Sequence, residues 1–228
     1  ESDLNLSKVD VDKLIKNKSL QNIENLKIQG KVKSQFSINF DKTLKVVNYK
    51  LDVAGDLKKA NIKFSEPKNY LFIKNKVSNI NFVKTAFNVN FYKDDKKSID
   101  IQGTYKINNN LFQKFDLKHL FNPNLQKFSF NGDFNSEIVI PFLNFSTKNK
   151  TVNIITDFEI KKNELNLKRF ILKDTKNKID INNLFVKNKK LIKFDNISVK
   201  TFINDKYNND FKINFDKTIQ VKGSKYDG

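Results

Sequence analysis

Apolar and polar residues alternate along most of this chain in runs of strand length, and no other feature constrains the fold as strongly. Between Ile99 and Ile107 every second position is apolar except one, which is Gly103. Alternation with a period of two places the apolar side chains on one face of a β-strand and the polar side chains on the other. About sixteen such runs, separated by short polar turns, predict an all-β fold.

Five of the six glycines lie within predicted strands in one frame, apolar-x-Gly-x-apolar, with a looser copy near the end of the chain. They are Gly30, Gly55, Gly103, Gly132 and Gly223. A glycine inside a strand contributes no packing and often marks a bend, a bulge or a close approach of another group. Two interpretations stay open: the glycines curve a long, mostly antiparallel sheet of hairpins, or their missing side chains also leave room for a ligand along the apolar face.

Two predicted strands change the phase of their apolar residues. Tyr49, Leu51, Val53 and Leu57 share one phase, whereas Ile62 has the opposite one, which predicts a β-bulge between residues 58 and 61. A similar phase shift occurs in the run 165–172. Both runs therefore keep one apolar face only if an extra residue is accommodated within the strand.

The first two dozen residues differ from the rest. Apolar residues at positions 11, 14, 15, 20 and 23 have the spacing of a short amphipathic helix, with Asp10 or Asp12 as its cap. Further along, Asn108–Asn110 predicts a hairpin turn because Asn tolerates positive φ. The run Leu111–Phe121 fits a strand or a helix, and Pro141 predicts an edge strand or a bulge.

The formal net charge of +18 suggests a nucleic-acid partner at first sight, but Arg169 is the only arginine. Arginine is the usual reader of base edges, and the lysines here alternate with apolar residues along strands. The chain is also rich in Asn, Ile and Phe, which share A/T-rich codons with Lys. We therefore expect lysine to serve as the general polar residue of solvated faces, with no specific nucleic-acid binding.

Catalysis finds little support in the residue types. The sequence has one histidine, His119, and no cysteine, which excludes an ordinary zinc ligand set and thiol chemistry. No glycine-rich phosphate loop follows a strand and opens a helix. We expect a protein that is not an enzyme and that needs no metal or cofactor.

The 22 phenylalanines concentrate on alternating strand positions. One interpretation is the closed core of a β-sandwich; the other is a hydrophobic groove on a curved sheet that shields acyl chains, where each buried methylene contributes about 0.8 kcal/mol. The candidate groove residues are Ile101, Gly103, Tyr105, Phe128, Phe130, Gly132, Phe134, Phe158, Ile160, Leu165, Leu167, Phe211, Ile213 and Phe215.

Three segments carry a resemblance to a known family. They are Ile99-Asp-Ile-Gln-Gly103 after a polar turn, the run from Leu165 to Asp174 that leads to Ile179-Asp-Ile181, and the terminal Val221-Lys-Gly-Ser-Lys-Tyr-Asp-Gly228. With the successive hairpins, these segments resemble the AsmA-like superfamily of bacterial envelope proteins, in particular its large YhdP/TamB type. The resemblance covers most of residues 26–228.

The resemblance implies a segment of an intermembrane lipid-transfer protein in the bacterial periplasm, with phospholipid as its partner. It also implies an inner-membrane anchor outside this sequence, so that residues 1–228 would be one continuous AsmA-like β domain and an internal fragment of a larger protein. The family has no catalytic motif to transfer. The alternative is a structural or adhesive β-sandwich domain of the cell envelope that binds no ligand.

Overall fold

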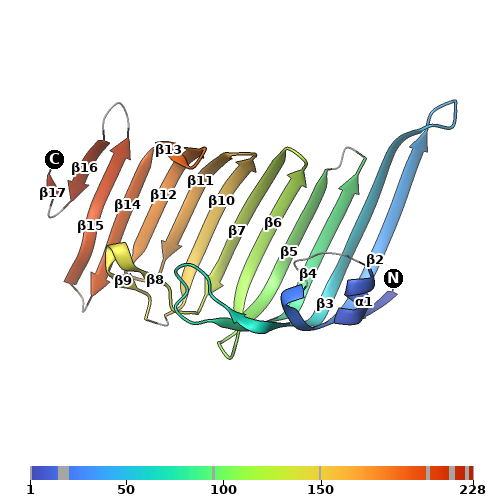
Figure 1. The fold of residues 1–228 in the computed structure, drawn as a ribbon, viewed down its shortest axis with the longest axis horizontal. Helices are drawn as coiled ribbons and strands as arrows, with labels where there is room; N and C mark the ends of the chain where they lie inside the picture. The colour runs from blue at the N-terminus through green and yellow to red at the C-terminus, as the bar shows by residue number, and fades with distance from the viewer. Residues whose placement is uncertain are drawn as a thin grey trace. The chain divides into compact units, whose positions relative to one another are not determined.

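The fold is all-β, with antiparallel strands arranged as successive hairpins and one short helix near the N-terminus (Figure 1). The alternation of the sequence therefore predicted the fold class correctly. The computed structural model describes residues 2–14, 21–93, 96–148, 150–203, 206–215, 219–223 and 226–227.

Contacts divide the chain into two compact units, Glu1–Pro123 and Asn124–Gly228. One continuous domain over residues 1–228 stays a prediction. In the described part of the first unit the strands pair in chain order as a meander. Its elements are β1 (Ser2–Ser7), α1 (Lys8–Leu14), β2 (Ile23–Phe40), β3 (Val46–Lys68), β4 (Val77–Tyr92), β5 (Lys97–Ile107) and β6 (Gln113–Asn122).

The second unit is also a sheet of antiparallel hairpins, in which the connection between β7 and β10 carries a small sheet of its own, β8 paired with β9. The order of the main sheet is β7, β10, β11, β12, β14, β15, β16, β17, and β13 pairs with β12. The bounds are β7 (Leu125–Phe134), β8 (Val139–Ile140), the 3-10 helix η2 (Pro141–Leu143), β9 (Phe145–Ser146), β10 (Val152–Lys161), β11 (Glu164–Lys173), β12 (Lys178–Lys187), β13 (Lys190–Lys193), β14 (Asn196–Ile203), β15 (Lys206–Phe215), β16 (Ile219–Gly223) and β17 (Tyr226–Asp227).

The described part of the N-terminal helix is α1 (Lys8–Leu14), and a strand that the sequence pattern missed, β1, precedes it. Ser7, rather than an aspartate, is the N-cap of α1. The Ser7 backbone N–H and Oγ donate to Asp10 Oδ2 at 2.9 and 2.6 Å, and the Asp10 backbone N–H donates back to Ser7 Oγ at 3.4 Å. The predicted helical positions 15 and 20 lie outside the described residues, and Ile23 begins β2.

One turn prediction and two strand predictions have clear outcomes. Asn108 has a φ of 53° at the β5–β6 turn, which confirms the hairpin prediction. The run Leu111–Phe121, which fitted a strand or a helix, forms strand β6 from Gln113 onward, whereas Leu111 and Phe112 precede the strand. The prediction for Pro141 is wrong, because this residue begins η2, where its fixed φ suits a helical turn and its missing N–H costs nothing.

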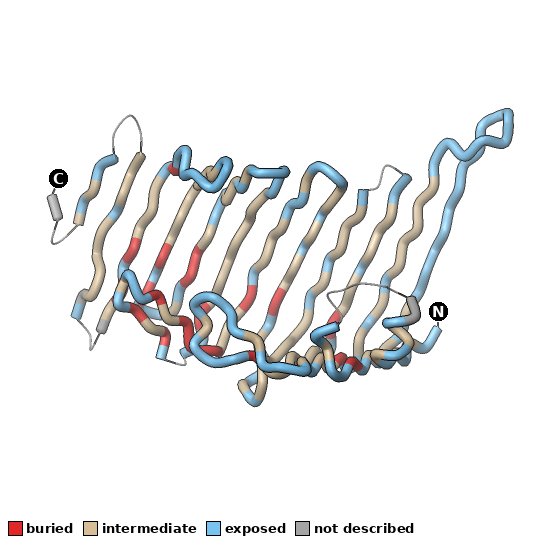
Figure 2. Tube along the Cα trace, in the orientation of Figure 1, coloured by how far each residue is buried: buried red, intermediate tan, exposed pale blue. Residues whose placement is uncertain are grey.

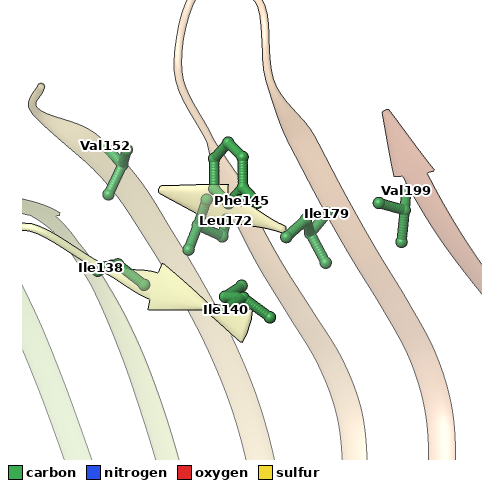
Figure 3. Close-up of a cluster of buried hydrophobic side chains, with 7 residues drawn as sticks. All are labelled: Ile138, Ile140, Phe145, Val152, Leu172, Ile179 and Val199. Atoms are coloured by element: carbon green, nitrogen blue, oxygen red, sulfur yellow. The ribbon is translucent and has the colours of Figure 1, made fainter. Parts of the chain in front are cut away.

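Buried apolar residues gather in the second unit (Figure 2). The segment from Ile138 to Phe145 lies on the apolar face of the sheet, and its side chains pack on residues of β10, β11, β12 and β14 (Figure 3). The cluster consists of Ile138, Ile140, Phe145, Val152, Leu172, Ile179 and Val199. This segment therefore covers one end of the sheet, as the second layer of a sandwich would.

Candidate apolar binding face

The apolar residues of the first unit form rows that run across the sheet from β2 to β6. Residues that pair across antiparallel strands lie on the same face, so the pairing registers define each row. One row is Val32, Gly55, Phe87, Ile101 and Leu117, and the next is Ser34, Val53, Val89, Ile99 and His119. The sole histidine thus belongs to the apolar face, where its ring stacks on Phe121 with the ring centroids 4.6 Å apart.

Most residues in these rows are only half-buried. In the described part of the first unit the buried apolar residues are Leu26, Ala60, Val77 and Phe115. The rings of Phe82, Tyr105 and Phe115 meet edge-on or tilted, with centroids between 5.4 and 6.4 Å apart. Phe87, Val89, Ile99 and Ile101 keep partial exposure, so the central rows have no complete protein layer over them within the described residues.

Bulges keep these rows on one face. Gln29 pairs with Lys59 and Gly30 pairs with Leu57, so Lys58 is the extra residue of β3, which confirms the predicted bulge. The register of β4 against β5 also shifts, between Val83 and Ala86. In the second unit Asp157 pairs with Arg169 and Phe158 pairs with Leu167, so that Lys168 is the extra residue behind the phase shift of the run 165–172.

The space beside the strand glycines is occupied by protein. A Cβ atom on Gly103 would lie 2.6 Å from the Cα of Thr85, and one on Gly55 would lie 2.3 Å from the carbonyl oxygen of Lys31. Gly30 and Gly223 face backbone carbonyl oxygens in the same way. The interpretation that the missing side chains leave room for a ligand does not hold beside these four glycines, Gly103 included, because atoms of the neighbouring strand fill the space. Curvature of the sheet at the glycines stays a prediction.

The apolar face of the second unit is open at one end. Phe128 of β7 stacks on Phe158 of β10 with the ring centroids 4.8 Å apart, and Phe158 pairs with Leu167. Ile160 pairs with Leu165 in the next row, nearer to the hairpin turn, and each of the two is 36% exposed. The open end therefore presents stacked aromatic and aliphatic side chains that the segment 138–145 does not reach.

The predicted groove residues thus fall into four groups. Ile101, Gly103 and Tyr105 lie on β5 in the first unit. In the second unit Phe128, Phe158, Ile160, Leu165 and Leu167 lie at the open end, whereas Phe134 and Phe211 pack against the covered cluster. Phe130, Gly132, Ile213 and Phe215 occupy the same face; Gly132 is buried, and Phe215 packs on Phe194 at a centroid distance of 5.4 Å.

The opposite face of both sheets is polar and carries the ion pairs. In the second unit Glu159 accepts from Lys168 at 2.9 Å and from Lys127 at 3.0 Å, which links β7, β10 and β11 at the bulge. Hydrogen bonds from Lys168 and then Lys127 lower the pKa of the Glu159 carboxyl from its usual value. One face of each sheet is thus solvated and the other is left for apolar contacts.

Sequence reasoning missed three features of this face. They are Thr85, which fills the space beside Gly103; the segment 138–147, which covers part of the second sheet; and the long β2–β3 hairpin. The phase change between Phe82 and Phe87 indicates the bulge that brings Thr85 toward β5. The covering role of residues 138–147 has no local sequence signal.

The described residues contain no group of three or more His, Cys, Asp or Glu side chains arranged to hold a metal ion. None of the described helices has both the length and the apolar character needed to cross a bilayer. Comparisons with models of protein families, with curated proteins and with solved structures found no match to this chain.

Proposed function

We propose that this chain is a segment of a periplasmic intermembrane lipid-transfer protein that shields phospholipid acyl chains on the apolar face of its sheet. The observation that carries the proposal is the set of half-buried apolar rows across β2 to β6, which have no complete protein layer over them in the described part of the first unit. The proposal assigns no chemistry to the chain.

The dimensions of the face suit an acyl chain. Neighbouring strands lie about 4.8 Å apart, so a row from β2 to β6 extends about 19 Å. One leaflet of a bilayer has a hydrocarbon thickness of about 15 Å, half that of the core. A single row is therefore long enough to receive one acyl chain of ordinary length, and parallel rows provide for a second.

The exposed surface is large for a chain of this mass. The accessible surface is 15452 Å² for 26.7 kDa, whereas one globular protein of this mass exposes about 10,700 Å² and two globular domains of half the mass about 13,000 Å² together. Soluble monomers rarely leave large contiguous apolar patches uncovered. The excess surface supports the proposal that a partner covers the apolar face. Acyl chains suit this face because its row of Val32, Gly55, Phe87, Ile101 and Leu117 contains no charged residue.

Photocrosslinking on two adjacent aromatic residues tests the proposal. Phe91 lies on the apolar face, where it pairs with Leu51 and with Lys97, whose ammonium lies 5.9 Å from the centroid of the Phe91 ring. Tyr92 is the next residue and lies on the polar face. A benzoylphenylalanine at position 91 is expected to crosslink to phosphatidylglycerol supplied in detergent micelles. The same probe at position 92, matched in size, is expected to give little lipid adduct.

Mass spectrometry of the two crosslinked variants gives the readout. Lipid adducts at position 91 at least about tenfold above position 92 are expected if acyl chains lie on the apolar face. Equal yields at both positions, or no adduct at either in folded protein, would remove the support for an acyl-chain site in the first unit.

The alternative, a structural or adhesive domain of the cell envelope without a ligand, has one observation in its favour. The segment 138–147 covers the apolar face at one end of the second unit, as a sandwich layer does. If native mass spectrometry of the purified chain detects no lipid, and fluorescent phosphatidylglycerol never binds to the folded chain, this closed interpretation is the better one.

A further inference from the structure

The β2–β3 hairpin of the first unit extends beyond its neighbours (Figure 1). β4 pairs with β3 only from Lys50 onward, and β1 pairs with β2 only as far as Val32. In the described residues the β3 positions 46–49 therefore have β2 as their only neighbouring strand; Val46, Asn48 and Tyr49 pair with it, and Val47 is the extra residue of a bulge. At about 3.4 Å per residue, this two-stranded ribbon projects about 13 Å before its turn begins.

The ribbon has one apolar face, which continues the apolar rows of the sheet. Phe36 pairs with Leu51, Ile38 with Tyr49 and Phe40 with Val46. Phe36 is 61% exposed and Phe40 is 53% exposed, and Figure 2 shows the projecting part of the hairpin as exposed. A two-stranded hairpin is marginally stable in water by itself, so large exposed side chains on one face indicate a surface that contacts a partner.

The turn of the hairpin holds a leucine at the tip. The carboxylate Oδ1 of Asp41 accepts from the Thr43 backbone N–H at 2.7 Å, from Thr43 Oγ1 at 2.7 Å and from the Lys45 backbone N–H at 3.0 Å. The hydrogen bond from the Thr43 side chain and that from the Lys45 backbone lower the pKa of this carboxyl. Leu44 adopts a φ of 60° and is 81% exposed, so the turn is built to present this side chain.

Lysines surround the apolar tip. Between residues 33 and 50 the chain has four lysines and one aspartate, and the ammonium of Lys93 donates to the carbonyl oxygens of Val46 and Val47 at 3.1 and 2.5 Å. An apolar end with a basic rim matches the interface of an anionic bilayer, where each lysine near the surface adds to binding.

We propose that the tip of the β2–β3 hairpin, residues 36–47, inserts into the surface of a membrane that contains anionic phospholipid. Interfacial elements bury their apolar side about 5 to 10 Å into the boundary between headgroups and acyl chains, and the ribbon projects far enough to do so. The apolar face of the tip then continues into the rows of the sheet through Phe36 and Leu51, with Ser34 and Val53 as the next pair. A role of the tip in passing lipid to the sheet rests on the proposed function, whereas membrane binding itself does not.

A second copy of the chain fits the tip less well. The outer edge of β2 beyond Val32 pairs with no strand in the described residues and could accept one. In a symmetric contact, however, the same surface meets itself, which would bring Lys33, Lys42 and Lys45 of both copies together. Lysine is a residue that protects sheet edges from such pairing.

Vesicle flotation tests the proposal on the whole chain. The wild-type chain is expected to bind vesicles of phosphatidylcholine that contain about 30% phosphatidylglycerol, because the anionic lipid attracts lysines near the surface. It is expected to bind vesicles of pure phosphatidylcholine weakly. The double variant Phe40→Ser/Leu44→Asn is expected to lose at least about tenfold in binding to the anionic vesicles. Asn suits position 44 because it tolerates positive φ.

Two further variants separate the contribution of the lysines to vesicle binding from a general effect of exposed apolar residues. Lys42→Gln/Lys45→Gln is expected to reduce the preference for anionic vesicles and the sensitivity of binding to salt. The control is Leu191→Ser/Ile192→Ser, which removes two exposed apolar side chains from β13 in the second unit and is expected to bind vesicles as the wild type does.

Three results would overturn the inference. The first is equal vesicle binding by the wild type and the Phe40/Leu44 variant, and the second is an equal loss of binding in the control. The third is a wild-type dimer, detected by light scattering, that this variant converts to monomer, because the tip would then bind a second copy. Crosslinking of lipid at position 91 in micelles does not need the tip, so failure of the inference and failure of the proposed function are distinguishable.

Discussion

Gly103 shows how a single missing side chain permits two strands to approach. β4 bulges toward β5 at Lys84 and Thr85, and Thr85 is 1% exposed because it occupies the place that a side chain at position 103 would need. The nearest atoms include backbone, which cannot rotate away. The apolar-x-Gly-x-apolar frame therefore marks a position that tolerates no larger side chain well. The reason is the packing of β4 against β5 and not space for a ligand.

Gly103→Ala is expected to destabilise the chain by about 1 to 3 kcal/mol, the usual range for overpacking, without a specific effect on lipid binding. Denaturant unfolding measures the loss. Gln102→Ala is the matched control, since residue 102 is exposed on the polar face and such changes usually stay within about 0.5 kcal/mol. Equal stability of Gly103→Ala and the wild type would mean that the strands are farther apart than the structure has them.

At the scale of elements, the segment 138–147 decides whether the second sheet is open or covered. Phe145 is 3% exposed within the cluster, and Phe142, three residues earlier in η2, is 78% exposed. The Ile138 backbone N–H donates to Thr147 Oγ1 at 2.9 Å, which ties the ends of the segment together. One segment thus holds two phenylalanines in opposite environments.

Phe145→Ala is expected to cost about 3 to 5 kcal/mol of stability because it leaves a cavity in the cluster, whereas Phe142→Ala is expected to change stability by less than about 0.5 kcal/mol. Thermal and denaturant unfolding of the two variants check this. Similar losses of stability in the two variants would contradict the packing of the segment 138–147 on the second sheet.

At the scale of the whole molecule, the accessible surface of 15452 Å² exceeds the surface that two globular domains of half the mass expose together, about 13,000 Å². In the first unit most of the exposed large apolar side chains lie on the β2–β3 hairpin and in the segments 70–72 and 111–112, and the row residues Phe87, Val89, Ile99 and Ile101 are half-buried. Partial burial of this kind requires a folded sheet, because the rows exist only when the strands are paired.

The native chain is therefore expected to raise the fluorescence of Nile red, an uncharged dye chosen because an anionic dye would respond to the net charge of +18. Near-UV circular dichroism taken in parallel distinguishes a native state from a molten globule, which also binds such dyes. Phosphatidylglycerol is expected to displace the dye. A native spectrum with no dye binding would indicate that the apolar face is covered.

The sequence by itself determined the all-β class, the hairpin turn at Asn108 and the bulge at Lys58, because alternation, turn residues and phase act over a few neighbouring positions. It did not determine strand β1, the 3-10 helix at Pro141 or the contact between Thr85 and Gly103. These depend on partners that are distant in the chain, such as Ser2 with Val32 and Phe145 with the sheet residue Leu172. Which apolar residues are covered and which stay half-exposed was decided only by the tertiary structure, since identical alternation occurs in both and burial depends on what packs above the sheet.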